Sequence, residues 1–456
     1  MPTPLHQVFR GRRVVLPDGV RAASVTVTDG VVTSIDNWAD GGAEGAAIVD
    51  VGDALLLPGL VDTHVHVNEP GRTHWEGFAS ATRAAAAGGV TTIVEMPLNS
   101  IPATTSAAAL RTKVAAADGQ LRVDVGFWGG VVPGNAEELR PLWEAGAWGF
   151  KCFMVPSGVD EFQGVAESDL RVAMPILAEL GAPLLVHAEL PGPIERAMED
   201  CAGLDPRRYA TYLRSRPPAA EVQAVELMVR LCREFGTRIH IVHLATAAAL
   251  PLLRTARAEG LPITVETCPH YLHFAAEDIA DGATAWKCAP PIRERAEREA
   301  LWDALAAGDI DLVASDHSPC PPEMKGMDPG DFFAAWGGIA SLQLGLPAVW
   351  SGARARGLGI ERVVEWMSAA PARLAGLDPR KGGIAVGRDA DLVVFDPHAQ
   401  AAVDPAGLHH KHPVTPYAGD VLCGQVLATY VRGALVYDRG HFSADPAGRI
   451  LTRGQE

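Results

Sequence analysis

The chain has 456 residues, 48% of them hydrophobic, so it is long enough for one large domain or two to three smaller ones. Its formal net charge is -16, and this acidity argues against nucleic-acid binding, which needs a basic face. No stretch reaches the roughly 18–20 apolar residues of a membrane span, and residues 1–13 lack an apolar signal core. The seven scattered cysteines form no C-x-x-C pair, which indicates reduced thiols and a cytoplasmic protein.

Both ends of the chain are predicted to be β-rich. Residues 11–16 and 22–27 are short β-type segments, and Asp29-Gly30 is a hairpin turn signal before 31–35. After about residue 376 the β pattern returns, with strands expected at 392–395, 421–432 and 434–437. We therefore expect residues 1–56 and 376–456 to form one small β-sandwich domain.

Between these ends, residues 57–375 alternate between apolar strands and helices. Strands are predicted at 57–65, 90–96, 122–128, 147–154, 183–187, 238–244, 262–267 and 310–315. Helices are predicted at 74–88, 106–117, 136–145, 167–180, 219–235, 247–259, 294–307, 341–350 and 361–369. Eight strand–helix units are typical of an α/β fold of the (β/α)8 TIM barrel type. The connection 188–219 contains several prolines, among them Pro191, Pro193, Pro217 and Pro218, and is predicted to be a long loop that builds the site.

Two histidines stand one residue apart at the end of the first barrel strand. In a strand, residues i and i+2 point to the same face, so His64 and His66 project together. Neutral imidazoles are ligands for zinc and similar ions. The alternative is a pair of core histidines with satisfied hydrogen bonds, but the pattern favours a metal pair.

Four further strands carry ligand-type side chains at the barrel end where active sites form. These are Lys151, His187, His243 and Asp316. A lysine inside an apolar strand is unfavourable unless it is paired or neutralised. A deprotonated Lys151 can react with carbon dioxide, and the resulting N6-carboxylate can bridge two cations. The set suits two divalent ions, with Zn²⁺ as the first choice and Co²⁺, Mn²⁺, Fe²⁺ or Ni²⁺ as alternatives.

At these six positions the sequence resembles the cyclic-amide branch of the amidohydrolase family, which includes dihydroorotases, dihydropyrimidinases (hydantoinases) and allantoinases. The resemblance covers nearly the whole chain and implies a barrel with a β-sandwich built from both termini, and a homotetramer. It assigns His64, His66 and Asp316 to one metal, and His187 and His243 to the other. It also implies that carboxylated Lys151 bridges both ions.

Two positions distinguish members of this branch. Where dihydroorotases carry an arginine that binds the substrate carboxylate, this chain has Asn68. Where dihydropyrimidinases carry an oxyanion-binding tyrosine, it has Val155. Residues 68–78 and 151–162 resemble allantoinase segments, so we expect hydrolysis of allantoin to allantoate. The alternatives are a hydantoinase with another ring preference, a non-catalytic scaffold on the same fold, and a mononuclear deaminase, against which Lys151 argues.

The resemblance implies that a hydroxide between the metals attacks the ring amide carbonyl. Asp316 is the expected catalytic residue, first as base and then as acid. Candidate substrate contacts are Asn99, Cys288, Ser318 and His270. The alternative for Asn99 and Ser318 is that they cap the following helices.

Five further residues, in three places, are predicted to have structural roles only. His409, His410 and His412 are predicted to lie in a surface loop. His240 is expected to face the helices, because strand alternation places it opposite His243. Trp336 is interpreted as packing, with the alternative that it forms part of the pocket wall.

Overall fold

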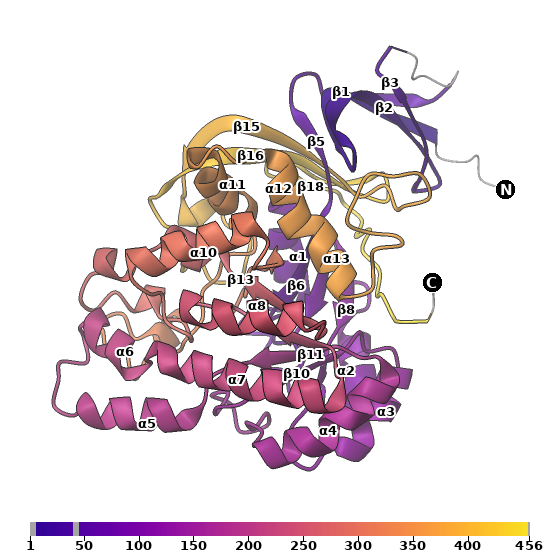
Figure 1. Cartoon of the computed structure of the whole chain (residues 1–456). Coiled ribbons are helices and arrows are strands. Elements are labelled where there is room, and N and C mark those ends of the chain that lie inside the picture. Colours follow the sequence, from indigo (N-terminus) through magenta and orange to yellow (C-terminus); the bar gives the residue numbers. More distant parts are fainter. Residues whose placement is uncertain (1–5, 40–44, 455–456) are drawn as a thin grey trace.

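The computed structural model describes residues 6–39 and 45–454. Residues 1–5, 40–44 and 455–456, all within the predicted β domain, lie outside the described residues. A barrel with helices around it adjoins a β domain in which both ends of the chain meet (Figure 1). The described ranges contain no helix with the length and apolar character that crossing a membrane requires.

The predicted barrel strands are all present and run parallel. They are β6 (Leu60–Val65), β7 (Val90–Glu95), β8 (Asp124–Phe127), β9 (Gly129–Gly130), β10 (Phe150–Phe153), β11 (Leu184–His187), β12 (Ile239–Ile241), β13 (Ile263–Thr267) and β14 (Leu312–Val313). One of the eight barrel strands is interrupted at Trp128 and therefore comprises both β8 and β9. The ring closes between its last and first strands, where His66 N donates to His317 O at 2.9 Å. The (β/α)8 barrel is therefore confirmed.

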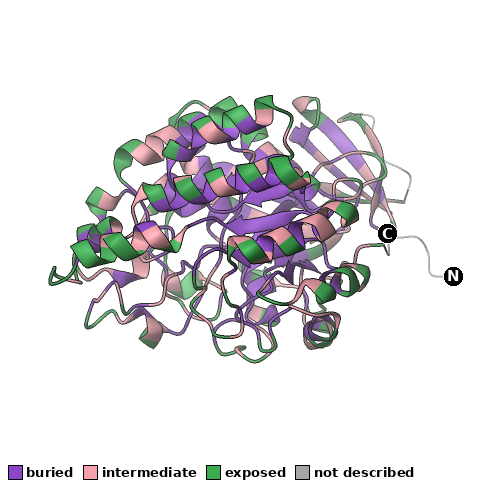
Figure 2. Cartoon of the chain, turned by 60° about the horizontal axis from the view of Figure 1, so that its bottom comes forward, coloured by how far each residue is buried: buried purple, intermediate pink, exposed green. Residues whose placement is uncertain are grey.

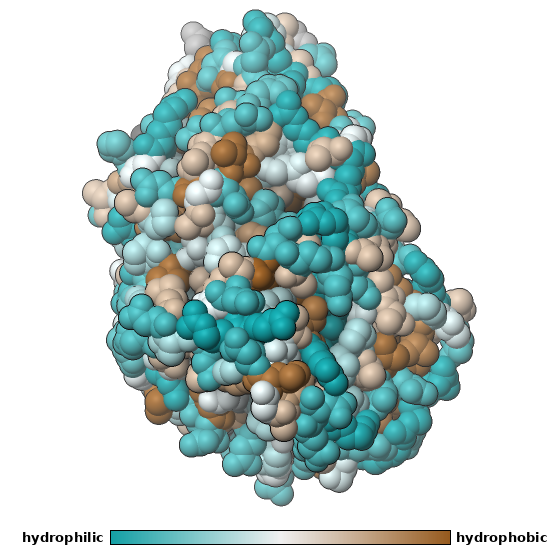
Figure 3. All heavy atoms as spheres, turned by 90° about the vertical axis from the view of Figure 1, so that its left-hand side faces the viewer, coloured by the Kyte–Doolittle hydropathy of each residue, from teal (hydrophilic) through white to brown (hydrophobic). Residues whose placement is uncertain are grey.

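The helices of the barrel bury one face and expose the other (Figure 2). They are α1 (Phe78–Ala87), α2 (Ala107–Ala117), α3 (Ala136–Glu144), α4 (Glu167–Leu180), α7 (Pro218–Phe235), α8 (Leu250–Ala258), α9 (Pro269–His273), α10 (Arg295–Ala307), α11 (Gly345–Ala355), α12 (Ile360–Val364) and α13 (Ala370–Leu374). The helix predicted at 106–117 is α2, and Ser106 caps its start, because Ser106 Oγ accepts from Ala109 N at 3.2 Å. On the face in Figure 3 hydrophilic side chains predominate and apolar ones are scattered.

The connection 188–219 is not the continuous loop that the prolines suggested. It contains α5 (Pro191–Asp200) and α6 (Tyr209–Ser215). Pro191 is the first residue of α5 and Pro218 the first of α7, positions where the missing N–H and the fixed φ of proline favour a helix start. The prolines thus begin helices here.

The β domain is a nine-stranded sheet that joins both ends of the chain. Its order is β18 (His441–Phe442), β17 (Ala434–Asp438), β16 (Val421–Val431), β15 (Leu392–Ala402), β5 (Leu55–Pro58), β1 (His6–Leu16), β2 (Gly19–Thr28) and β3 (Val31–Asn37), while β4 (Ala47–Asp50) pairs with β1. The predicted turn Asp29-Gly30 connects β2 to β3. Phe9, Val25 and Leu392 share one buried core within this domain.

The predicted strand 57–65 is divided, and its first residues belong to the β domain. Gly59 separates β5 from barrel strand β6, and a Cβ atom there would lie 2.1 Å from Thr91 Oγ1. Only glycine allows the chain to pass this close to β7. The β domain is thereby joined, through one residue, to the strand that ends in His64 and His66.

A buried ion cluster also joins the domain to the barrel. Lys381 Nζ lies 2.6 Å from Asp124 of β8, and 2.8 Å from both Asp389 and Asp391 before β15. All four side chains are buried. Since the lysine compensates carboxylates from both parts of the chain, separating the parts would leave buried charges unpaired.

Candidate metal centre and active site

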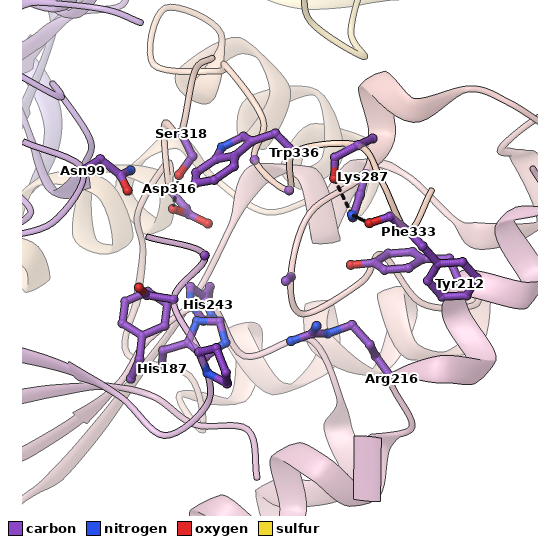
Figure 4. Close-up of a pocket in the computed structure, with 18 of the residues that line it drawn as sticks. Asn99, His187, Tyr212, Arg216, His243, Lys287, Asp316, Ser318, Phe333 and Trp336 are labelled. Atoms are coloured by element: carbon purple, nitrogen blue, oxygen red, sulfur yellow. Dashed lines mark hydrogen bonds between the residues drawn. The ribbon is translucent and has the colours of Figure 1, made fainter. Parts of the chain in front are cut away.

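A cavity of about 660 Å³ opens at the ends of the barrel strands where the ligand-type residues were predicted. His64, His66, His187, His243 and Asp316 all line it. Figure 4 shows His187, His243 and Asp316 on the same part of the wall. Active sites of such barrels form at this end of the strands.

His64, His66 and Asp316 form one close group. Asp316 Oδ1 lies 3.2 Å from His64 Nε2 and 3.5 Å from His66 Nε2. All three side chains are buried, and their candidate ligand atoms lie within 4.8 Å of one another. Two imidazoles and a carboxylate at this spacing can bind one divalent ion.

His187 and His243 lie directly beside this group. Their ring centroids are 4.6 Å apart, and the His243 ring is 5.4 Å from that of His64. No hydrogen-bond partner for His243 Nδ1 is found within the described part of the chain. This pair could supply the ligands of a second ion.

Lys151 is completely buried on β10. Within residues 6–39 and 45–454, its Nζ has no hydrogen-bond partner. Burial lowers the pKa of Lys151 to about 8, against the opposing charges of Glu266 and Asp316. Its Nζ lies 5.2 Å from the Phe153 ring centroid, and this ring stacks on His187 at 4.4 Å between centroids, which places the lysine beside the histidines. A neutral amine in this position is the form that can react with carbon dioxide.

Two glutamates that the sequence interpretation missed orient the histidines. Glu266 Oε1 lies 2.5 Å from His64 Nδ1, and Glu189 Oε2 lies 2.8 Å from His187 Nε2. Since carboxylates only accept, these ring nitrogens donate, and the other nitrogen of each ring keeps its lone pair. The lone pair at His64 Nε2 then faces an Asp316 oxygen, an arrangement of two acceptors that suits a cation.

The protonation states also suit metal binding. Burial lowers the pKa of His66 to about 4, although Asp316 opposes the shift. Burial likewise lowers the pKa of His187 and His243. For Asp316 burial acts in the raising direction, but the neighbouring histidines outweigh it, and the pKa falls well below its usual range. Neutral imidazoles and an ionised carboxylate are the ligand forms.

Of the four candidate substrate contacts, two line the cavity. Ser318 Oγ donates to Asp316 Oδ1 at 2.8 Å, and Asn99 Nδ2 lies 3.5 Å from His66 Nδ1. The capping alternative is wrong for both, because Ser106 precedes α2 and Pro321 precedes the short helix after Ser318.

The other two candidates, Cys288 and His270, are buried outside the cavity lining. The residues on either side of Cys288, Lys287 and Ala289, do line it. The Cys288 carbonyl accepts from the Tyr212 hydroxyl at 2.6 Å, while the His270 ring packs against Tyr271 at 4.2 Å between centroids.

Several cavity residues were not anticipated as contacts. They include Phe153, Ser157, Tyr212 and Arg216. Arg216 Nη2 lies 2.6 Å from Glu189 Oε2, so this cation supports the carboxylate that orients His187. Tyr212 lies in α6 and Arg216 directly follows this helix, which the sequence did not predict.

Two histidine predictions are wrong. His410 is 4% exposed, with its ring 5.6 Å from that of His317, because the backbone of Lys411 donates to buried Glu76 and anchors this segment. His240 does not face the helices: its Nε2 bonds Glu266 at 2.9 Å. Strand alternation fails because β12 ends at Ile241 and His243 has a φ of 39°.

The Amidohydrolase family profile matches residues 55–436. The chain belongs to the amidohydrolase family. Within this family it is 50% identical to an allantoinase from Streptomyces avermitilis over 98% of each chain. It is 45% identical to an allantoinase from Arabidopsis thaliana, over 98% of this chain and 90% of the relative.

The family assignment also agrees with solved structures. The L-hydantoinase (dihydropyrimidinase) from Arthrobacter aurescens superposes with a TM-score of 0.93 at 33% identity, over 98% of this chain and 99% of that chain. The barrel with its small β domain is therefore the architecture of this amidohydrolase too.

Proposed function

We propose that this protein is an allantoinase, which hydrolyses the ring amide of allantoin to give allantoate. The observation that carries the proposal is the convergence of four histidines and Asp316 on one cavity at the strand ends, with Lys151 buried beside them. The allantoinase relatives, at up to 50% identity over nearly the full chain, support allantoin as the substrate. A non-catalytic scaffold would have no need for this ligand set.

The donor set fits a pair of divalent ions. His64, His66 and Asp316 would bind one, and His187 and His243 the other. Carboxylated Lys151 would bridge them. Zinc suits these nitrogen and oxygen ligands, and cobalt, manganese, iron or nickel would fit the same set. Such a pair polarises a carbonyl oxygen and lowers the pKa of water.

Asp316 is the proposed proton carrier. During hydrolysis a water oxygen bonds to the ring carbonyl carbon, the ring C–N bond breaks, and a proton must reach the leaving nitrogen. Asp316 is an ionised carboxylate in the cavity wall and can accept the water proton, then deliver it to that nitrogen. The Ser318 hydroxyl, which donates to Asp316 Oδ1, fixes the orientation of the carboxylate.

A panel of cyclic amides tests the proposal. Purified protein, reconstituted with zinc and bicarbonate, is assayed on allantoin, hydantoin, dihydrouracil and dihydroorotate. We expect the highest kcat/KM on allantoin, with allantoate as product. A higher kcat/KM on any other ring would overturn the choice of substrate and favour the hydantoinase alternative.

The family resemblance also supports a homotetrameric assembly, which light scattering after gel filtration would test. The free state of all seven cysteines agrees with a cytoplasmic location. We assign residues 57–375 to the catalytic barrel, and 1–56 with 376–456 to the β domain, except that Leu57 and Pro58 complete β5 in the sheet of the β domain.

A further inference from the structure

Trp336 is the largest aromatic side chain in the wall of the cavity. It lines the cavity together with Asp316 and Ser318, and Figure 4 shows the indole on their side, with Arg216 opposite. The residue is only partly buried, because its ring borders the open space. It follows barrel strand β14 in the chain, as Asp316 does.

The indole is fixed by packing on two sides. The Trp75 ring meets it edge to face, with centroids 4.8 Å apart and planes at 71°. On another side lies Gly158, where an added Cβ would be 3.4 Å from the indole. Gly158 also has a φ of 93°, so a larger residue there would be strained as well as crowded. The ring therefore has little freedom to turn away from the cavity.

The backbone beneath the ring is held as well. Trp336 N donates to Met324 O at 2.8 Å, and the buried Lys325 ammonium donates to Trp336 O at 3.1 Å. The same ammonium reaches Lys287 O at 3.2 Å. One lysine thus connects the loop of Trp336 to the neighbouring loop of Lys287.

A further set of contacts joins Trp75 to the rim of the cavity. The Arg72 guanidinium lies 5.1 Å from the Trp75 ring centroid and pairs with Glu161, and its Nη1 donates to Asn99 O at 2.8 Å. Four loops, those after β6, β7, β10 and β14, are therefore connected through Arg72, Trp75 and Trp336. Such a connected wall presents one shape to the substrate.

We infer that Trp336 determines specificity for the group carried on the substrate ring. In allantoin this group is a ureido group, which is planar, narrow and polar at its edges. A flat indole face accommodates such a plane by stacking, while its edges remain available for hydrogen bonds. The fixed ring also blocks bulky aliphatic or aromatic substituents. This inference rests on the proposed function, since it assumes that the ring amide is placed against the Asp316 side of the cavity.

The test compares three substrates in Trp336→Ala and Trp336→Phe. Allantoin carries the ureido group, hydantoin carries no substituent, and 5-benzylhydantoin carries a bulky one. For Trp336→Ala we expect kcat/KM on allantoin to fall about tenfold or more, a loss typical of one removed pocket contact. The value for hydantoin, or its inhibition constant when it is not hydrolysed, stays within about threefold. The value for 5-benzylhydantoin rises, and Trp336→Phe lies between Ala and wild type.

Metal content and a matched control separate this role from a structural one. Zinc per chain is expected to be unchanged in both variants, and Trp286→Phe, outside the cavity lining, behaves as wild type. Equal losses on all three substrates, lost zinc, or no change would overturn the inference. A wild type that is inactive on allantoin refutes the proposed function instead. If Trp336→Ala does not fold, the same selective change is required of Trp336→Phe.

Discussion

Glu266 fixes the tautomer of His64: its Oε1 lies 2.5 Å from His64 Nδ1, while its Oε2 lies 2.9 Å from His240 Nε2. Both histidines must donate to this carboxylate. Burial acts to raise the pKa of Glu266, but the charges and hydrogen bonds of the two histidines lower it well below the usual range. An ionised Glu266 is therefore part of the native site.

Replacing Glu266 with glutamine is expected to weaken metal binding. The new amide can donate to His64 Nδ1 and so favour the wrong tautomer. We expect zinc affinity to fall about 10–100-fold, as for other residues that support metal ligands. Competition with a coloured chelator measures the affinity. Exposed Glu226→Gln is the control, and equal affinity in the two variants would contradict the role of Glu266.

Lys151→Ala is expected to remove the bridge between the two proposed ions. The variant should bind fewer than two zinc ions per chain, and its kcat/KM on allantoin should fall to below about 1%. Exposed Lys411→Ala serves as the control. In the wild type, labelled ¹³C-bicarbonate should give a carbamate carbon signal that Lys151→Ala lacks. Two bound ions and full activity in Lys151→Ala would refute the bridge.

Breaking the buried pair of Lys113 and Glu95 is expected to destabilise the protein strongly. Lys113 Nζ of α2 lies 2.5 Å from Glu95 Oε2 of β7, and both side chains are fully buried. Lys113→Met leaves the carboxylate unpaired, so we expect a loss of about 3–5 kcal/mol in the free energy of unfolding. Replacing both residues with methionine should restore much of this, because no buried charge remains. Urea denaturation measures both, and a double variant less stable than Lys113→Met would contradict this account.

His270 is expected to make the protein acid-sensitive. Burial lowers its pKa to about 4 from the ordinary 6.5. As the pH falls from 6.5 to 4, the unfolded chain takes up a proton that the native state excludes, so the free energy of unfolding decreases. The contribution reaches up to about 3 kcal/mol. Urea denaturation across this range should show a smaller pH slope for His270→Gln. Exposed His441→Gln should keep the wild-type pH slope. Equal pH slopes in the wild type, His270→Gln and His441→Gln would refute the prediction.

The sequence was sufficient to predict the barrel because its strands are short apolar runs whose ends carry unusual residues. The buried position of Lys151 shows why this works. A charged group in an apolar strand is unfavourable, so its presence there indicates a neighbouring charge or a reaction that removes its own. Glu266 lies in β13 and carries the same signal, but it was not among the ligand-type residues that the sequence predicted.

Other features depend on contacts between distant segments. The segment of His410 resembles an exposed polar loop, and only its bonds to Glu76, more than 300 residues away, bury it. His240 reaches Glu266 because the strand ends before His243, and no local pattern encodes that end. The prolines of the 188–219 connection were equally consistent with a loop and with two helix starts. Periodicity describes neighbours along the chain and cannot describe such pairings.

The position of β5 between β1 and β15 has a consequence for biosynthesis. A ribosome releases β5 early, but the partner on one edge, β15, emerges only after the whole barrel has been translated. Until then that edge has unpaired backbone donors and acceptors, which invite pairing with other chains. The next strand after Gly59 is β6, which positions His64 and His66. A truncated product that lacks β15 would therefore expose an unpaired, aggregation-prone edge of β5 close to the incomplete metal site, and chaperones would have to shield that edge.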